Sequence, residues 1–69
     1  MNRYSAIVGK RVEAHYRASD SRFSAVGVLV SDTGTSIFIE ERLSQGGRQK
    51  TFRVEIPYEY VLHIAEATS

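Results

Sequence analysis

The segment from Phe23 to Val30 constrains the fold more than any other part of the chain. If this run is a strand, apolar side chains fall on both of its faces, and Gly27 interrupts it in the middle. A strand with a glycine in its interior carries a bulge or bends sharply. We therefore predict a strongly bent strand whose two halves serve two sides of the same core.

Four further segments have the spacing of strands. Residues 11–18 alternate strictly, with Val12, Ala14 and Tyr16 on one face, which is typical of a half-buried strand. The other predicted strands cover residues 36–43, 48–56 and 61–64.

Turn-forming residues separate these segments. Residues 19–22 and 32–35 predict turns, and residues 44–47 give the strongest hairpin signal because paired glycines suit turns that match strand twist. Pro57 must end the strand before it, because proline has no N–H for a ladder. Residues 58–60 are just long enough for one tight turn.

A length of 69 residues allows one compact domain. Residues 2–8 predict a turn or two of helix closed by Gly9, and residues 66–69 predict a frayed tail. Five short, bent antiparallel strands bury one core best by curling into a barrel, which also reduces exposed edges. We therefore predict an all-β fold, a five-stranded, strongly bent antiparallel small barrel over residues 1–69.

Composition excludes several classes of function. The absence of cysteine excludes disulfides, thiolate-bound zinc and cysteine nucleophiles. A net charge of +1 is too small for a strong polyanion-binding field over the whole chain. The longest uncharged runs are too short to span a bilayer, and the first residues lack the apolar stretch of a secretory signal. We expect a cytoplasmic protein with no membrane partner.

Few side chains have an arrangement that suits catalysis or metal binding. Glu13 and His15 share one strand face. They could form a general base and the residue that orients it, but a solvent-exposed strand face is the simpler interpretation. His63 has no clear carboxylate partner at ligand spacing. Glu40 and Glu41 are adjacent on a strand, so they point to opposite faces and cannot converge on a cation. We expect no enzymatic activity, no metal and no cofactor.

Several motifs resemble the Sm-like family of small barrels, and the resemblance covers nearly the whole chain. Residues 9–12 read G-K-R-V at the start of the first predicted strand, and residues 27–29 read G-V-L on the bent one. Asp32 matches the family's Asp before the third strand, and Ser36 takes the place of its Asn with the spacing one residue short. Residues 56–64 keep the apolar frame of the family's last motif, I-R-G-x-x-V-x-x-I.

The resemblance implies sites for RNA and for self-assembly. Sm-like rings hold RNA bases in pockets formed by the loops after the second and fourth strands, which here contain Asp32, Thr35 and Ser36 and then Pro57 and Tyr58. The family's Arg-Gly pair is replaced by Pro57-Tyr58, and Tyr58 could stack on a base. Sm-like subunits also pair their edge strands into closed rings, which implies a homo-oligomer.

Two observations on the residues themselves bear on these sites. Arg48 and Lys50 lie on the same side of one predicted strand, just beyond Phe52 and near the hairpin tip, where they are candidates for nucleic-acid binding. The last strand is apolar and has neither Lys nor Pro to discourage edge pairing. Alternatively, Asp32 and Thr35 only form a turn, and Tyr58 and Tyr60 only close the end of the barrel.

A second resemblance gives the alternative function. Residues 57–61, P-Y-E-Y-V, resemble the closing segment of Src-homology-three domains, and residues 14–16 weakly match their opening aromatic motif. That resemblance implies a peptide-binding module of the Src-homology-three or Tudor-like type, using Tyr16, Pro57, Tyr58 and Tyr60. The chain has no Trp for such a groove, and its hairpin over residues 36–56 is longer than that family normally carries. The leading interpretation is a non-enzymatic Sm-like protein that assembles with itself and binds single-stranded RNA.

Overall fold

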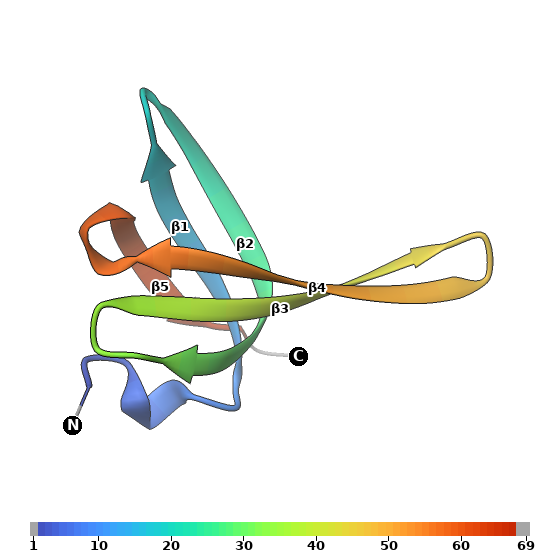
Figure 1. Ribbon diagram of the computed structural model, residues 1–69, viewed down its shortest axis with the longest axis horizontal. Coiled ribbons are helices and arrows are strands. Elements are labelled where there is room, and N and C mark those ends of the chain that lie inside the picture. Colours follow the sequence, from blue (N-terminus) through green and yellow to red (C-terminus); the bar gives the residue numbers. More distant parts are fainter. Residues whose placement is uncertain (1, 68–69) are drawn as a thin grey trace.

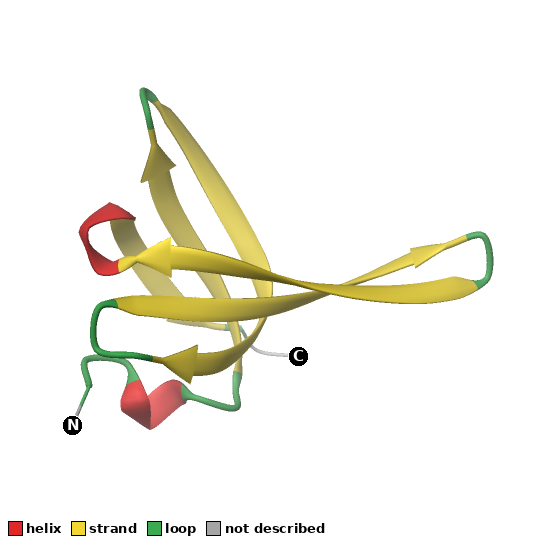
Figure 2. Cartoon of the chain, viewed as in Figure 1, coloured by secondary structure: helices red, strands yellow, loops and turns green. Residues whose placement is uncertain are grey.

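Five antiparallel strands form one sheet in the computed structural model, which describes residues 2–67 (Figure 1). The strands follow the order β4-β3-β2-β1-β5 across the sheet. Two short 3-10 turns, η1 and η2, are the helical segments of the described residues, and strands dominate the fold (Figure 2). The elements are η1 (Ser5–Ile7), β1 (Arg11–Ala18), β2 (Ser21–Asp32), β3 (Ser36–Gln45), β4 (Arg48–Pro57), η2 (Tyr58–Tyr60) and β5 (Val61–Glu66).

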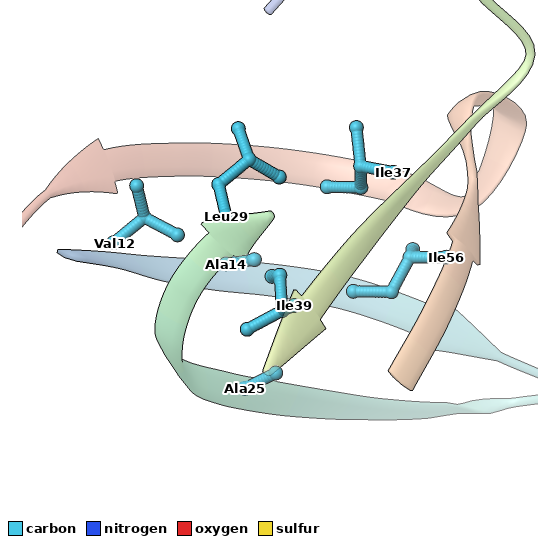
Figure 3. Packing of buried hydrophobic residues seen from close by; sticks show 7 residues of the cluster. All are labelled: Val12, Ala14, Ala25, Leu29, Ile37, Ile39 and Ile56. Atoms are coloured by element: carbon cyan, nitrogen blue, oxygen red, sulfur yellow. The ribbon is translucent and has the colours of Figure 1, made fainter. Parts of the chain in front are cut away.

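The predicted bent strand is β2, and Gly27 lies where it changes partners. The first part of β2 pairs with β1, as far as Val28 opposite Arg11, whereas its last part pairs with β3. A Cβ atom on Gly27 would collide with the backbone oxygen of Glu40, so glycine is required where the β3 backbone crosses closely. Figure 3 shows β2 curving around the core at this place.

The sheet is open. β4 and β5 are its two ends, and within residues 2–67 β5 makes backbone pairs with β1 alone. The prediction of an all-β antiparallel fold with five strands is therefore confirmed, whereas a closed ladder is not observed in the described residues. The short β5 pairs on one side only, because the neighbouring η2 turn carries the chain from β4 across to β1 without continuing the ladder.

The core is small and comes from four of the five strands. Its side chains point toward one another between the two sides of the bent sheet (Figure 3), and each is almost completely shielded from solvent. Burial of such aliphatic side chains contributes about 1.5–3 kcal/mol for each larger residue. The core consists of Val12, Ala14, Ala25, Leu29, Ile37, Ile39 and Ile56.

The ends of the described chain differ from the sequence prediction. Residues 2–8 contain one three-residue 3-10 turn and no longer helix, since so short a helix needs packing to persist. Gly9 has φ +94°, as expected for a closing glycine, and its N–H donates to the carbonyl of Leu29 (2.7 Å). The predicted tail from residue 66 is wrong for its first two residues: Glu66 ends β5, and the N–H of Ala67 donates to the Arg11 carbonyl (2.8 Å). Residues 68 and 69 lie outside the described part.

The predicted turns lie where expected, but three of them are shorter than predicted, since β2 begins at Ser21 and ends at Asp32 and β3 ends at Gln45. Gly46 and Gly47 both have positive φ, 59° and 78°, as a two-residue hairpin turn with the right twist requires. Pro57 is the last residue of β4, and η2 is the tight turn predicted after it.

A long hairpin extends beyond the core. The β2–β3 ladder begins at the pair Val28–Glu40, whereas the β3–β4 ladder continues from there to the pair Gln45–Arg48. Residues 41–52 therefore project from the body of the molecule, as Figure 1 shows, and we refer to them as the arm.

Candidate functional site

The structure divides the predicted binding residues into two groups. Ser36 pairs with Pro57 across β3 and β4, and the N–H of Tyr58 donates to the carbonyl of Thr35 (2.9 Å). Together with Asp32 these residues form one cluster, where the β2–β3 turn meets the β4–η2 junction. The remaining two predicted residues, Arg48 and Lys50, lie at the opposite end of β4, on the arm.

The carboxylate of Asp32 is engaged within the cluster. It accepts hydrogen bonds from the Tyr58 hydroxyl, from the N–H of Gly34 (2.9 Å) and from the N–H of Tyr4 (2.8 Å). Burial by itself would raise the pKa of the Asp32 carboxyl, but these hydrogen bonds, with the charge of Arg3, lower this pKa below its ordinary value. Burial, and then the bond to Asp32, raise the pKa of Tyr58.

The aromatic ring of Tyr58 is also in contact with the N-terminal segment. The guanidinium of Arg3 lies over the ring, 4.9 Å from its centroid, and the ring of Tyr4 meets it edge-on at 5.5 Å. The side chain of Asn2 adds a hydrogen bond to the Asp32 carbonyl (2.8 Å). We call these three N-terminal residues, with Asp32 and Tyr58, the latch, because they attach the start of the chain to the sheet.

The other members of the cluster differ in exposure. Ser36 is 7% exposed, and its N–H donates to the Thr33 hydroxyl (3.1 Å), which fixes the turn. Pro57 is half-buried, whereas Thr35 is exposed. Both the Asp32 carboxylate and the Tyr58 ring have internal partners, which favours the interpretation that this cluster stabilises the β2–β3 turn and its junction with η2.

The arm has the opposite character, because its side chains face solvent, except for that of Glu41, which lies opposite Phe52 and is half-buried. Arg48, Lys50 and Phe52 alternate along β4 and therefore lie on one face, and Leu43 lies opposite Lys50 on β3. Phe52 is 47% exposed and Leu43 is 49% exposed, although both are large and apolar. Scattered exposed apolar residues are ordinary, but here two of them share a face with two cations.

Positive charge is concentrated on the arm. Residues 41–52 contain three Lys or Arg and one Glu, a formal charge of +2, whereas the whole chain carries +1. The rest of the chain therefore carries −1. Sequence reasoning found Arg48 and Lys50 but missed Arg42 and Leu43, whose relevance depends on how far the hairpin projects.

The residues weighed for catalysis and metal binding remain apart or are paired. The Nε2 atom of His15 lies 3.7 Å from Oε1 of Glu13, and both side chains are about half exposed. The His15 ring stacks on that of His63 across the β1–β5 ladder. The carboxylate of Glu40 accepts a hydrogen bond from the side chain of Arg53, and that of Glu41 accepts one from the backbone N–H of Val26. Within residues 2–67 there is no group of three or more His, Asp or Glu side chains placed to hold a metal ion.

The residues of the alternative peptide groove are only partly gathered. Tyr16 lies opposite Val61, directly after η2, and it stacks on Phe23 at 5.8 Å. Tyr60 is exposed, whereas Tyr58 has its ring partners in the latch.

Comparison with known proteins matched no family model, no curated protein and no solved structure. The resemblances to Sm-like and Src-homology-three proteins therefore depend on the motifs given above and stay predictions. In the part of the chain that the structure describes, neither helical segment has the length or hydrophobicity needed to cross a membrane.

Proposed function

We propose that this chain is a non-enzymatic, Sm-like small-barrel protein that assembles with itself and binds single-stranded RNA. The observation that carries the RNA part is the solvent-exposed face of the arm, where Arg48 and Lys50 accompany an exposed Phe52. Single-strand binders combine cations that follow the phosphates with aromatic rings on which bases stack.

The strand geometry suits this task. Side chains two residues apart on a strand are separated by about 6.8 Å, so Arg48, Lys50 and Phe52 form a regular row. The two cations contact successive phosphates, and one base stacks on Phe52, a contact worth about 1–3 kcal/mol. Because such contacts read no base edges, we expect little sequence preference between oligo-U and oligo-A.

The test is fluorescence anisotropy with labelled oligo-U and oligo-A at several salt concentrations. For the wild type, affinity falls as salt rises. The double variant Arg48→Gln/Lys50→Gln binds more weakly, and the slope of its log–log salt plot is smaller by about 1–1.5. Phe52→Ala weakens binding with no change in that slope.

A matched control removes the same amount of charge elsewhere. Arg17 and Arg22 face each other on the exposed β1–β2 hairpin, away from the arm. Arg17→Gln/Arg22→Gln should therefore bind RNA as the wild type does. Absence of binding by the wild type at low salt, or equal losses in the two double variants, would overturn the proposal.

Self-assembly is supported by the two ends of the sheet. β4 and β5 each have one edge without a backbone partner in the described residues, and Leu62 on β5 is 48% exposed. β5 has neither Lys nor Pro, so this edge is suited to pairing with another chain, whereas β4 contains Lys50 and ends at Pro57. Size-exclusion chromatography with light scattering should give a mass that is a multiple of 7.8 kDa. A monomer alone at micromolar concentration would overturn this part.

A further inference from the structure

A shallow depression lies where β2 and β3 separate, outside the arm face and outside the latch. It exists because the β2–β3 ladder starts only at Val28–Glu40, so that Val26 has no backbone partner on β3. We call this depression the notch; its volume is about 220 Å³. The notch is lined by Arg11, Val26, Gly27, Val28, Glu40 and Arg42.

The notch carries uncompensated positive charge. Glu40, the one acidic residue that lines it, is paired with Arg53, whose Nε lies 3.3 Å from Oε2, and the neighbouring Glu41 carboxylate accepts a hydrogen bond from the N–H of Val26 (3.2 Å). Among residues 2–67 the guanidinium groups of Arg11 and Arg42 form no ion pair and no hydrogen bond. Two planar guanidinium groups at one depression are suited to an oxyanion, and above all to phosphate, which accepts several hydrogen bonds at once.

The notch also has an apolar surface. Val26 is 39% exposed, and Val28 is half-buried beside it. A simple inorganic anion would leave these valines in water, whereas a ligand with a flat, weakly polar body would cover them. The volume lies below the range of about 300–1,000 Å³ usual for small-molecule sites, so it suits one small unit rather than a longer ligand.

We propose that the notch binds a nucleoside monophosphate group, with its phosphate at Arg11 and Arg42 and its base against Val26 and Val28. The group is either a free nucleotide or the 5′-phosphorylated end of an RNA strand. The notch is independent of the arm face, because Arg42 and Leu43 are neighbours on β3 and point to opposite sides. Loss of RNA binding on the arm therefore leaves this site intact.

The experiment is a titration of the ¹⁵N-labelled chain with AMP, followed by the amide signals of Val26, Gly27 and Val28. AMP shifts these signals, whereas adenosine and inorganic phosphate at the same concentration shift them less, since each supplies half of the ligand. Equal shifts with inorganic phosphate, or no shift of these amides with AMP, would overturn the proposal.

Variants test the two arginines. Arg11→Gln/Arg42→Gln weakens AMP binding by about tenfold or more, because hydrogen bonds to a charged phosphate are lost. The control Arg17→Gln/Arg22→Gln changes the charge equally and leaves the AMP affinity unchanged. If the double variant does not fold, the single variant Arg42→Gln is tested instead, because Arg42 is exposed. An unchanged AMP affinity in the folded variant would contradict the proposal.

A final comparison distinguishes the two sources of the phosphate group. Oligo-A with a 5′-phosphate shifts the three notch amides more than unphosphorylated oligo-A if the site takes an RNA end. If both strands leave these amides unchanged while AMP shifts them, the site takes free nucleotides. Either result supports binding at the notch. Both measurements can be made in the variant Arg48→Gln/Lys50→Gln, in which RNA binding on the arm is weakened.

Discussion

At the scale of single residues, Asp32 and Gly27 have the largest structural roles for their size. The carboxylate of Asp32 gathers donors from Tyr4, Gly34 and Tyr58, and thereby connects the N-terminal segment, the β2–β3 turn and η2. Gly27 is required because it has no side chain: a Cβ atom there would occupy the same space as the β3 backbone.

Gly27→Ala is expected to lower the free energy of unfolding by about 3 kcal/mol or more, because backbone rather than a flexible side chain occupies the space. Urea unfolding followed by circular dichroism measures this. Gly46→Ala is the control: its Cβ meets no atom within 4 Å, and only its positive φ costs about 1 kcal/mol. Equal losses in the two variants would contradict the close approach.

The latch predicts a dependence of stability on acid. The pKa of the Asp32 carboxyl is lower in the folded chain than its ordinary value of about 3.8. The ionised group therefore stabilises the fold when the pH is above about 3.8, and this contribution is lost as the pH falls below that value. In samples below about pH 4, we expect the urea concentration at the unfolding midpoint of the wild type to decrease. The decrease should be smaller in Asp32→Asn, which has no carboxyl group at this position. An identical acid dependence in the two proteins would show that the latch carboxylate has no such role.

At the scale of elements, β4 has two different halves. Its C-terminal half packs on the core through Ile56, whereas its N-terminal half belongs to the arm and exposes Phe52. A strand that leaves the core keeps its backbone ladder but gains little from burial, so the arm is suited to contact other molecules.

Two substitutions on β4 test this division. Ile56→Ala should lower the free energy of unfolding by about 2–5 kcal/mol, because it leaves a cavity in the core. Phe52→Ala should change it by less than about 1 kcal/mol, since much of that ring is in water already. Thermal unfolding of the two variants provides the comparison. A large loss for Phe52→Ala would mean that the arm is packed in solution.

At the scale of the whole molecule, the small core and the two open sheet ends both favour contact between copies of the chain. Among residues 2–67, seven side chains form the core, and three of them are no larger than valine. A domain of this size buries only about 60% of its unfolded surface, so burial between copies would add stability.

The proposed self-assembly therefore predicts that the midpoint of thermal unfolding rises with protein concentration. Leu62→Lys, a charge on the exposed side of β5, should remove this dependence and reduce the oligomer mass, because an edge lysine opposes pairing. Calorimetry over a hundredfold range of concentration measures it. A midpoint independent of concentration in the wild type would count against assembly.

Local chemistry in the sequence determined the strands and their turns. Alternation placed Val12 and Ala14 on the buried face, paired glycines placed the hairpin turn at Gly46-Gly47, and Pro57 ended β4, because each effect acts within a few residues. The bend at Gly27 was also predicted, although its cause, the approach of Glu40, was not.

Tertiary structure alone decided what these elements do together. Nothing in the sequence around Arg3 or Tyr4 signals their contacts with Tyr58, which is more than fifty residues away. The open sheet, the projecting arm and the notch all depend on where β3 leaves β2, a balance of pairing and packing between segments distant in the chain. Periodicity cannot encode such a balance, because it records which face a side chain takes and not which partner meets it.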